Sequence, residues 1–178
     1  MDLIFINLLR KRLIDHLFKY HVQLSCDCAE FGVYEGTTAK YIFENCDGRK
    51  LYLFDSFEGL PEDWNKHFRK GDFRLKNLPN LPKDSIIYKG WFNKTIPNFI
   101  KRLKEPLAFI HIDSDLYSSA KDVLFGLNDK IIPGTVILFD EFLRGENIAF
   151  KEWINKFSRR CVMLKKTIHL QVAYMVVN

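Results

Sequence analysis

The sequence is sparse in cysteine and contains no Cys-x-x-Cys pair; its four cysteines are Cys26, Cys28, Cys46 and Cys161. Structural zinc sites are usually built from such closely spaced pairs, so their absence disfavours a zinc-binding module. Cysteine use of this kind is typical of a reducing compartment. We therefore expect a cytoplasmic protein with free thiols.

Long hydrophobic runs and a strong charge of one sign are also missing. No apolar run approaches the roughly 18 residues of a membrane span. The apolar run at residues 3–9 precedes its positive charges, whereas a signal peptide has the opposite order. The chain has 27 basic and 22 acidic residues, and the basic ones lie in short, separated groups. We expect neither a membrane nor a nucleic acid as partner.

Both common phosphate-binding motifs, G-x-G-x-x-G and the P-loop, are absent. Residues 29–38 read AEFGVYEGTT instead, with the spacing E-x-G-x-x-x-G at Glu30, Gly32 and Gly36. Glycine lets the backbone approach a ligand closely, and the helix expected from Thr37 offers free N–H groups. Glu30 would repel a pyrophosphate, so this turn suits a ligand with a positive group. Two glycines at a strand end can equally be plain turn residues, and the rest of the chain must decide.

The N-terminal segment, 1–22, contains an amphipathic pattern over 3–20. Ile6, Leu9, Leu13 and Leu17 recur at three- and four-residue steps with polar residues between them. We expect this helix to pack on the sheet or on a partner chain, in preference to acting as a lid. Its apolar face also suggests a homodimer.

Short apolar runs alternate with helical patterns in the rest of the chain. Strands are expected at about 26–33, 51–54, 85–88, 107–112 and 136–139, followed by a late antiparallel pair at 162–164 and 172–177. Helices are expected at about 37–46, 95–104, after Leu116 and around 150–157. This order predicts one α/β domain over 1–178, with core 23–178 built on a mostly parallel sheet and helices on both faces. The proline-spotted segment to about residue 84 is expected to be irregular, and either functional or mobile.

Acidic residues stand at or near the ends of four expected strands: Glu30, Asp55, Asp113 and the pair Asp140-Glu141. Ligands of such sheets bind beyond the carboxyl ends of the strands. Carboxylates crowded at one edge repel each other unless something positive joins them. Asp55 is placed to accept hydrogen bonds from a ribose; the alternative is that it caps the turn that follows.

A second group of acids comprises Asp113, Asp140 and Glu141. Three carboxylates at adjacent strand ends could hold Mg²⁺, which would lower the pKa of a substrate hydroxyl. The alternative is that Asp113 caps a helix while the pair is merely solvated. His111 should face the same side of its strand as Asp113, and a supporting role is favoured over a catalytic one. Asp115 could reach the same edge.

Five runs together resemble the macrocin O-methyltransferase family, a group of class I S-adenosylmethionine-dependent methyltransferases: EFGVYEGTTA, LYLFDSFEGLPEDW, YKGWFNKTIP, AFIHIDSDLYSSAKDVL and PGTVILFDEF. The resemblance covers residues 26–142, with a weaker echo in AFKEWINKF and LQVAYMV. It implies a Rossmann-like class I methyltransferase fold, a mostly parallel twisted sheet with an antiparallel C-terminal strand. One departure is Asp140-Glu141, where the family commonly has two aspartates.

The resemblance also implies site residues. Those expected to bind S-adenosylmethionine are Glu30, Gly32, Tyr34, Gly36, Thr37, Asp55, Ser56, Phe57, Gly90, Trp91 and Asp113. Asp113, Asp140 and Glu141 would hold Mg²⁺. The general base stays unassigned, with Asp113, Asp115 and His111 as candidates. The implied reaction is methylation of a hydroxyl on a sugar-like or other small polyhydroxyl acceptor. The alternatives are a metal-independent N- or O-methyltransferase and a non-catalytic module that binds S-adenosylmethionine.

Overall fold

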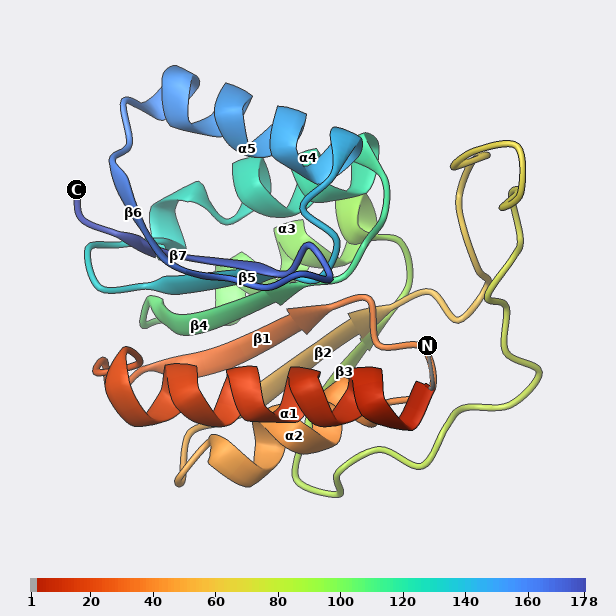
Figure 1. The fold of residues 1–178 in the computed structure, drawn as a ribbon, viewed down its shortest axis with the longest axis horizontal. Helices are drawn as coiled ribbons and strands as arrows, with labels where there is room; N and C mark the ends of the chain where they lie inside the picture. The colour runs from red at the N-terminus through yellow and green to blue at the C-terminus, as the bar shows by residue number, and fades with distance from the viewer. Residues whose placement is uncertain (1–2) are drawn as a thin grey trace.

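The computed structural model describes residues 3–178, so the first two residues of the N-terminal segment lie outside the description. A seven-stranded sheet runs through these residues in the order β3-β2-β1-β4-β5-β7-β6 (Figure 1). The strands are β1 Asp27–Phe31, β2 Leu51–Asp55, β3 Ile86–Lys89, β4 Leu107–Ile112, β5 Val136–Phe139, β6 Cys161–Lys166 and β7 Val172–Val176. The first five are parallel, and β7 runs antiparallel to both β5 and β6. The expected α/β fold, including its late antiparallel pair, is confirmed.

Helices cover both faces of the sheet. On one face lie α1 Leu3–Tyr20 and α2 Thr37–Asn45, whose apolar residues share a core with the sheet. On the other lie α3 Phe92–Arg102, α4 Tyr117–Gly126 and α5 Arg144–Phe157, over a second core (Figure 1). Each face therefore buries its own apolar layer, which explains why all six residues of β4 are buried.

The N-terminal helix packs on the domain, as expected. Leu13, Ile14 and Leu17 are buried, and the ring of Phe18 lies 4.8 Å from that of Phe109 in β4. Its N-terminal end reaches the edge of the sheet at which the parallel strands end (Figure 1). Phe5 stays 47% exposed at that end, so the expected self-association surface remains a prediction.

Two helices begin earlier than their apolar patterns suggest. α3 begins at Phe92 and α5 at Arg144, where the patterns start near 95 and 150. The first turn of α5 contains Gly145, a poor helix former, which hid the start. A Cβ atom on Gly145 would lie 2.7 Å from the backbone nitrogen of Tyr117, so only glycine lets this turn pack on the β4–α4 connection.

The segment between β2 and β3, residues 56–85, contains neither helix nor strand, as expected. It leaves the carboxyl edge of the sheet after β2 and ends at the opposite edge, where β3 begins parallel to β2 (Figure 1). Backbone hydrogen bonds between Leu60 and residues 71–72 fold its first half back on itself. Within residues 3–178, no helix combines the length and the apolar character needed to cross a membrane.

Candidate active site

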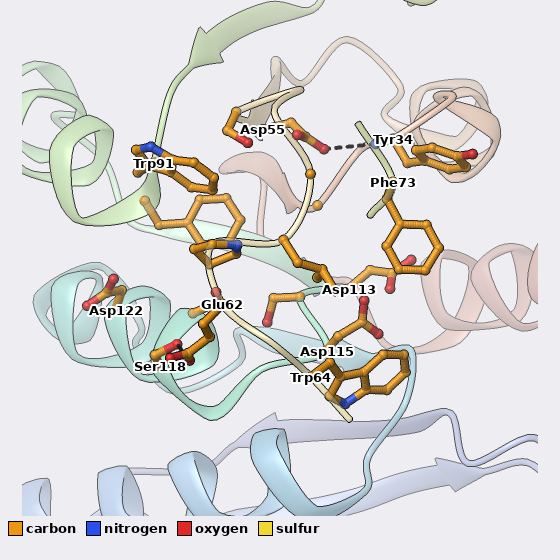
Figure 2. Close-up of a pocket in the computed structure, with 18 of the residues that line it drawn as sticks. Tyr34, Asp55, Glu62, Trp64, Phe73, Trp91, Asp113, Asp115, Ser118 and Asp122 are labelled. Carbon is orange, nitrogen blue, oxygen red and sulfur yellow. Dashed lines mark hydrogen bonds between the residues drawn. The ribbon is translucent and has the colours of Figure 1, made fainter. Parts of the chain in front are cut away.

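A cavity of about 560 Å³ lies at the carboxyl edge of the parallel strands (Figure 2). Its lining comes from the loops after β1, β3, β4 and β5, from the end of β2 and the segment 56–85 that follows it, and from α1, α3 and α4. The register brings these loops together, because Phe31, Ile112 and Phe139 are neighbours across three strands. The acids that follow those strands therefore meet at one place.

Charge in this cavity is strongly one-sided. Its lining contains seven carboxyl side chains, those of Asp55, Glu62, Asp113, Asp115, Asp122, Asp140 and Glu141. Arg10 of α1 is the one basic residue among the described residues that line it. A cavity with this lining suits a ligand that carries positive charge.

Asp55, the last residue of β2, fastens the turn after β1. Its Oδ2 accepts hydrogen bonds from the backbone N–H of Val33 at 2.7 Å and from that of Tyr34 at 2.9 Å. Figure 2 shows the bond to Tyr34. Its Oδ1 accepts one from the N–H of Phe57 at 2.7 Å. Asp55 thus caps turns, as in the alternative interpretation, and it also lines the cavity.

The two glycines of the β1 turn serve different contacts. Gly32 has φ +91°, and a Cβ atom there would lie 1.8 Å from the carbonyl oxygen of Asp113. A Cβ atom on Gly36 would lie 2.4 Å from Leu81 in the irregular segment. Gly32 lines the cavity and Gly36 does not. Both glycines are therefore required by contacts within the protein, with Asp113 and Leu81, before any ligand is considered.

Glu30 and His111 form a buried pair beneath the cavity. They are opposite each other in β1 and β4, and Nδ1 of His111 lies 3.1 Å from Oε1 of Glu30. Both residues are 0% exposed, and neither lines the cavity. Burial raises the pKa of Glu30, while the hydrogen bond from His111 opposes that rise. The supporting role favoured for His111 agrees with this placement, but direct contact of Glu30 with a ligand does not.

Four non-glycine residues in or next to the cavity lining have left-handed backbone conformations: Tyr34 at φ 47°, Phe57 at 57°, Phe73 at 66° and Asp115 at 62°. They stand in the loops after β1, β2 and β4. Such conformations cost about 1 to 3 kcal/mol each and persist where the surrounding contacts impose them. Here the amide groups of Tyr34 and Phe57 are held by Asp55. Their clustering at this edge is an observation on which a functional proposal can build.

Four carboxyl groups gather at the ends of β4 and β5. Burial, together with repulsion from Asp140 and Asp115, raises the pKa of Asp113 well above its usual range. Burial and the charges of Glu141 and Asp140 raise the pKa of Asp115 to about 7. The pKa of Glu141 is also raised, first by burial and then by Asp140. The raised pKa values of these groups show the mutual repulsion expected of crowded carboxylates.

A positive group joins these acids, and it comes from α1. Nε of Arg10 donates to Oδ1 of Asp140 at 3.0 Å, and Nη2 donates to Oδ2. Nε2 of Gln171 also donates to Oδ1, at 2.7 Å. Asp140 is only 2% exposed, and each of its oxygens accepts at least one hydrogen bond from another side chain.

This arrangement does not fit the expected Mg²⁺ site. A magnesium ion would have to share Asp140 with the positively charged guanidinium of Arg10, which would repel it, and both oxygens of Asp140 already accept hydrogen bonds from Arg10 and Gln171. Across residues 3–178, no three His, Cys, Asp or Glu side chains are grouped as metal ligands. The structure gives no support to magnesium binding by Asp113, Asp140 and Glu141.

Aromatic side chains form one wall of the cavity. The ring of Phe73 meets that of Tyr34 edge-on, with 5.7 Å between the ring centroids, and stacks on Phe68 at a centroid distance of 5.3 Å. Phe68 in turn stacks on Trp64, with 5.2 Å between the centroids. Figure 2 shows Phe73 and Trp64 on the side of the cavity where Asp115 lies, away from Trp91 and Asp122. Three of the four rings come from the irregular segment. The aromatic residues at positions 64, 68 and 73 could therefore have indicated from the sequence that this segment forms a wall of the cavity.

The cavity collects most of the residues expected from the sequence. Those that line it are Gly32, Tyr34, Asp55, Ser56, Gly90, Trp91, Asp113, Asp115, Asp140 and Glu141. Those that do not line it are Glu30, Gly36, Thr37, Phe57 and His111. Sequence reasoning missed Arg10 and also Glu146, which is buried in α5 and accepts a hydrogen bond from the N–H of Ser114 at 3.2 Å.

The family model described as Macrocin-O-methyltransferase (TylF) matches residues 11–169. The chain belongs to the macrocin O-methyltransferase family. One relative, 8-demethyl-8-(2,3-dimethoxy-alpha-L-rhamnosyl)-tetracenomycin-C 4'-O-methyltransferase of Streptomyces olivaceus, is 26% identical over 140 residues, 65% of this chain and 52% of that protein. The chain spans about half the length of the curated relatives it matches.

Solved methyltransferases share the fold of this macrocin O-methyltransferase family member. CalS11, a calicheamicin methyltransferase, is similar with a TM-score of 0.76 at 20% identity, over 94% of this chain and 79% of that one. An O-methyltransferase from Bacillus cereus in complex with SAH has a TM-score of 0.66 at 15% identity, over 96% of this chain and 80% of that one. The Rossmann-like class I methyltransferase fold implied by the sequence is confirmed.

Proposed function

We propose that this chain is an S-adenosylmethionine-dependent O-methyltransferase that acts on a hydroxyl of a small, sugar-like acceptor. The observation that carries the proposal is the acidic cavity at the carboxyl edge of the sheet, next to the turn that Asp55 holds closed. Family membership supports methyl transfer as the reaction. The relative from S. olivaceus is named for O-methylation of a compound with a rhamnosyl group, which supports the acceptor class.

The lining fits a cationic methyl donor in two ways. The carboxyl side chains favour a positively charged ligand, and the Gly32 backbone lies open to the cavity. When bound, S-adenosylmethionine supplies an electrophilic methyl group on a cationic sulfur. We assign its ribose to Asp55 and its adenine to the region of Gly90 and Trp91. The SAH complex of the B. cereus protein supports this class of ligand for the fold.

The acceptor would lie at the other end of the cavity, between the aromatic wall and the acids after β4 and β5. Aromatic faces bind the apolar side of a ring-shaped molecule, while the polar groups opposite fix its hydroxyls. Of the candidate general bases, His111 is enclosed in the core with Glu30. Asp113 and Asp115 line the cavity and stay partly accessible. We assign the base to Asp115, which would take the hydroxyl proton as the acceptor oxygen bonds the methyl carbon and the carbon–sulfur bond breaks, leaving S-adenosylhomocysteine.

No step of this reaction is assigned to magnesium, because the oxygens of Asp140 are engaged by Arg10 and Gln171. Orientation of the acceptor oxygen toward the methyl group supplies much of the expected acceleration. The proposal is tested by calorimetry with S-adenosylmethionine and by transfer of labelled methyl groups to a panel of sugars and glycosides. Failure of the intact protein to bind S-adenosylmethionine would end the proposal.

We expect Asp55→Ala to weaken S-adenosylmethionine binding by about 10- to 100-fold, because it removes both a ribose acceptor and three hydrogen bonds that shape the turn. Asp27→Ala is the matched control. Asp27 also joins β1 to β2, accepting from the N–H of Lys50 and the hydroxyl of Tyr52, both at 2.9 Å, but at the opposite edge of the sheet. Equal loss of affinity in both variants would show that Asp55 acts only through stability.

A further inference from the structure

Arg10 reaches the acidic end of the cavity from a distant part of the sequence. It stands on α1, 130 residues before Asp140, and bonds both oxygens of that carboxylate. The Arg10 side chain is 24% exposed and lines the cavity. A two-point contact of this kind fixes the plane of the guanidinium as well as its position.

The helix that carries Arg10 is firmly seated. Besides its buried leucines, α1 is joined to α2 by a salt bridge of 2.8 Å between Lys11 and Glu44 and by a hydrogen bond of 2.8 Å from Asn45 to Asp15. Arg10 is therefore a built part of the cavity and not a surface side chain that happens to lie near it.

The acids that surround Arg10 are those that would otherwise attract a divalent cation. Burial lowers the pKa of Arg10, but the charges of Asp140, Asp113 and Glu141 outweigh that effect and raise it. The guanidinium is thus held charged among the three carboxylates expected from the sequence to bind magnesium. A second cation at the same place would be repelled by Arg10 and would find Asp140 already bonded.

We propose that the Arg10 guanidinium takes the place of a divalent cation at the acceptor end of this cavity, where it binds the oxygen that receives the methyl group. The inference rests on the proposed function and specifies how the acceptor is held. A guanidinium has five N–H donors, and Arg10 uses two of them on Asp140. Among the described residues, no other acceptor bonds this group, so the remaining donors can meet acceptor oxygens.

This assignment also explains why a carboxylate base is needed. A bound divalent ion lowers the pKa of a hydroxyl strongly, whereas a guanidinium supplies only hydrogen bonds and a single delocalised charge. The acceptor hydroxyl therefore keeps its proton until a base takes it. Asp115 lines the same cavity as Arg10.

The first experiment measures metal binding directly. Mg²⁺ and Mn²⁺ are titrated calorimetrically into the intact protein, with and without S-adenosylmethionine. We expect no binding to the wild type below millimolar concentrations, and Mn²⁺ binding to Arg10→Ala that is at least about tenfold tighter. Arg12→Ala is the matched control, because Arg12 is exposed on the same helix and does not line the cavity.

The second experiment measures the role of Arg10 in acceptor binding. Arg10→Lys keeps one charge but loses the two-point contact, so it should still exclude Mn²⁺ while the KM for the acceptor rises about tenfold and the affinity for S-adenosylmethionine stays unchanged. EDTA should leave wild-type turnover unaffected.

Two results would overturn the inference: submillimolar Mg²⁺ binding by the wild type with turnover abolished by EDTA, or Arg10 variants that match the wild type in both metal affinity and acceptor KM. The wild-type titration needs no variant to fold. Loss of S-adenosylmethionine binding in the wild type would instead refute the proposed function, which is a separate readout.

Discussion

Asp115→Asn should lower kcat by about 100- to 10,000-fold while the affinity for S-adenosylmethionine changes by less than about twofold. The substitution keeps the shape of the side chain but removes its ability to accept a proton. Asp115 lines the cavity on the connection after β4, with φ 62°, and the first turn of α5 packs on that connection through Gly145. The carboxylate is therefore held in place by the backbone around it, as a general base requires.

The pH dependence of turnover should change in the same variant. The pKa of Asp115 is raised to about 7, so the group is protonated and unable to act as a base at lower pH. Wild-type kcat should then fall about tenfold for each pH unit below 7, and Asp115→Asn should lose this dependence. One charged group that bears on Asp115, Asp113, lies in the same connection. The others come from three other parts of the chain: Arg10 from α1, Asp140 and Glu141 from the loop after β5, and Glu146 from α5.

Asp122→Asn is the matched control for this substitution. Asp122 lines the same cavity from α4, and Figure 2 shows it on the far side from Asp115. Burial raises the pKa of Asp122 as well, so a general effect of removing cavity charge would appear in both variants. A similar loss of kcat in both, or an unchanged acid limb in Asp115→Asn, would contradict the assignment of Asp115 as the base.

The strand ends were predictable because their physical signal is local. The buried parallel strands β2, β4 and β5 are mostly apolar runs that stop at an acid, at Asp55, or just before one, at Asp113 and Asp140. Parallel strands end at one edge of a sheet, so the sequence alone places these acids together. Because crowded carboxylates repel each other, the sequence also predicted that a positive group joins them.

The identity of that positive group was not predictable, because it depends on packing between distant segments. Arg10 is one of several basic residues in an amphipathic helix, and nothing in its spacing separates it from Lys11 or Arg12. Its role follows from the side of the sheet on which α1 lies and from how far the helix extends. Glu30 shows the opposite case, since its motif position predicted a ligand contact and the β1–β4 register buries it against His111.

Gly32→Ala should destabilise the fold by about 3 to 5 kcal/mol, because it combines a left-handed backbone with a collision against backbone atoms. Gly32 has φ +91°, and the added Cβ atom would lie 1.8 Å from the carbonyl oxygen of Asp113. Main-chain hydrogen bonds hold both partners of this contact, from Gly32 to Phe54 and from Asp113 to Phe31. Neither strand can move aside without breaking the sheet at the cavity.

Gly48→Ala separates the two causes. Gly48 has φ +80°, close to the value for Gly32, but a Cβ atom there would have no heavy atom within 4 Å. It should cost only about 1 kcal/mol, the price of the backbone conformation alone. Urea unfolding of both variants, compared at equal m-values, measures the difference. Equal losses would mean that the approach of β1 to Asp113 is not what requires glycine at position 32.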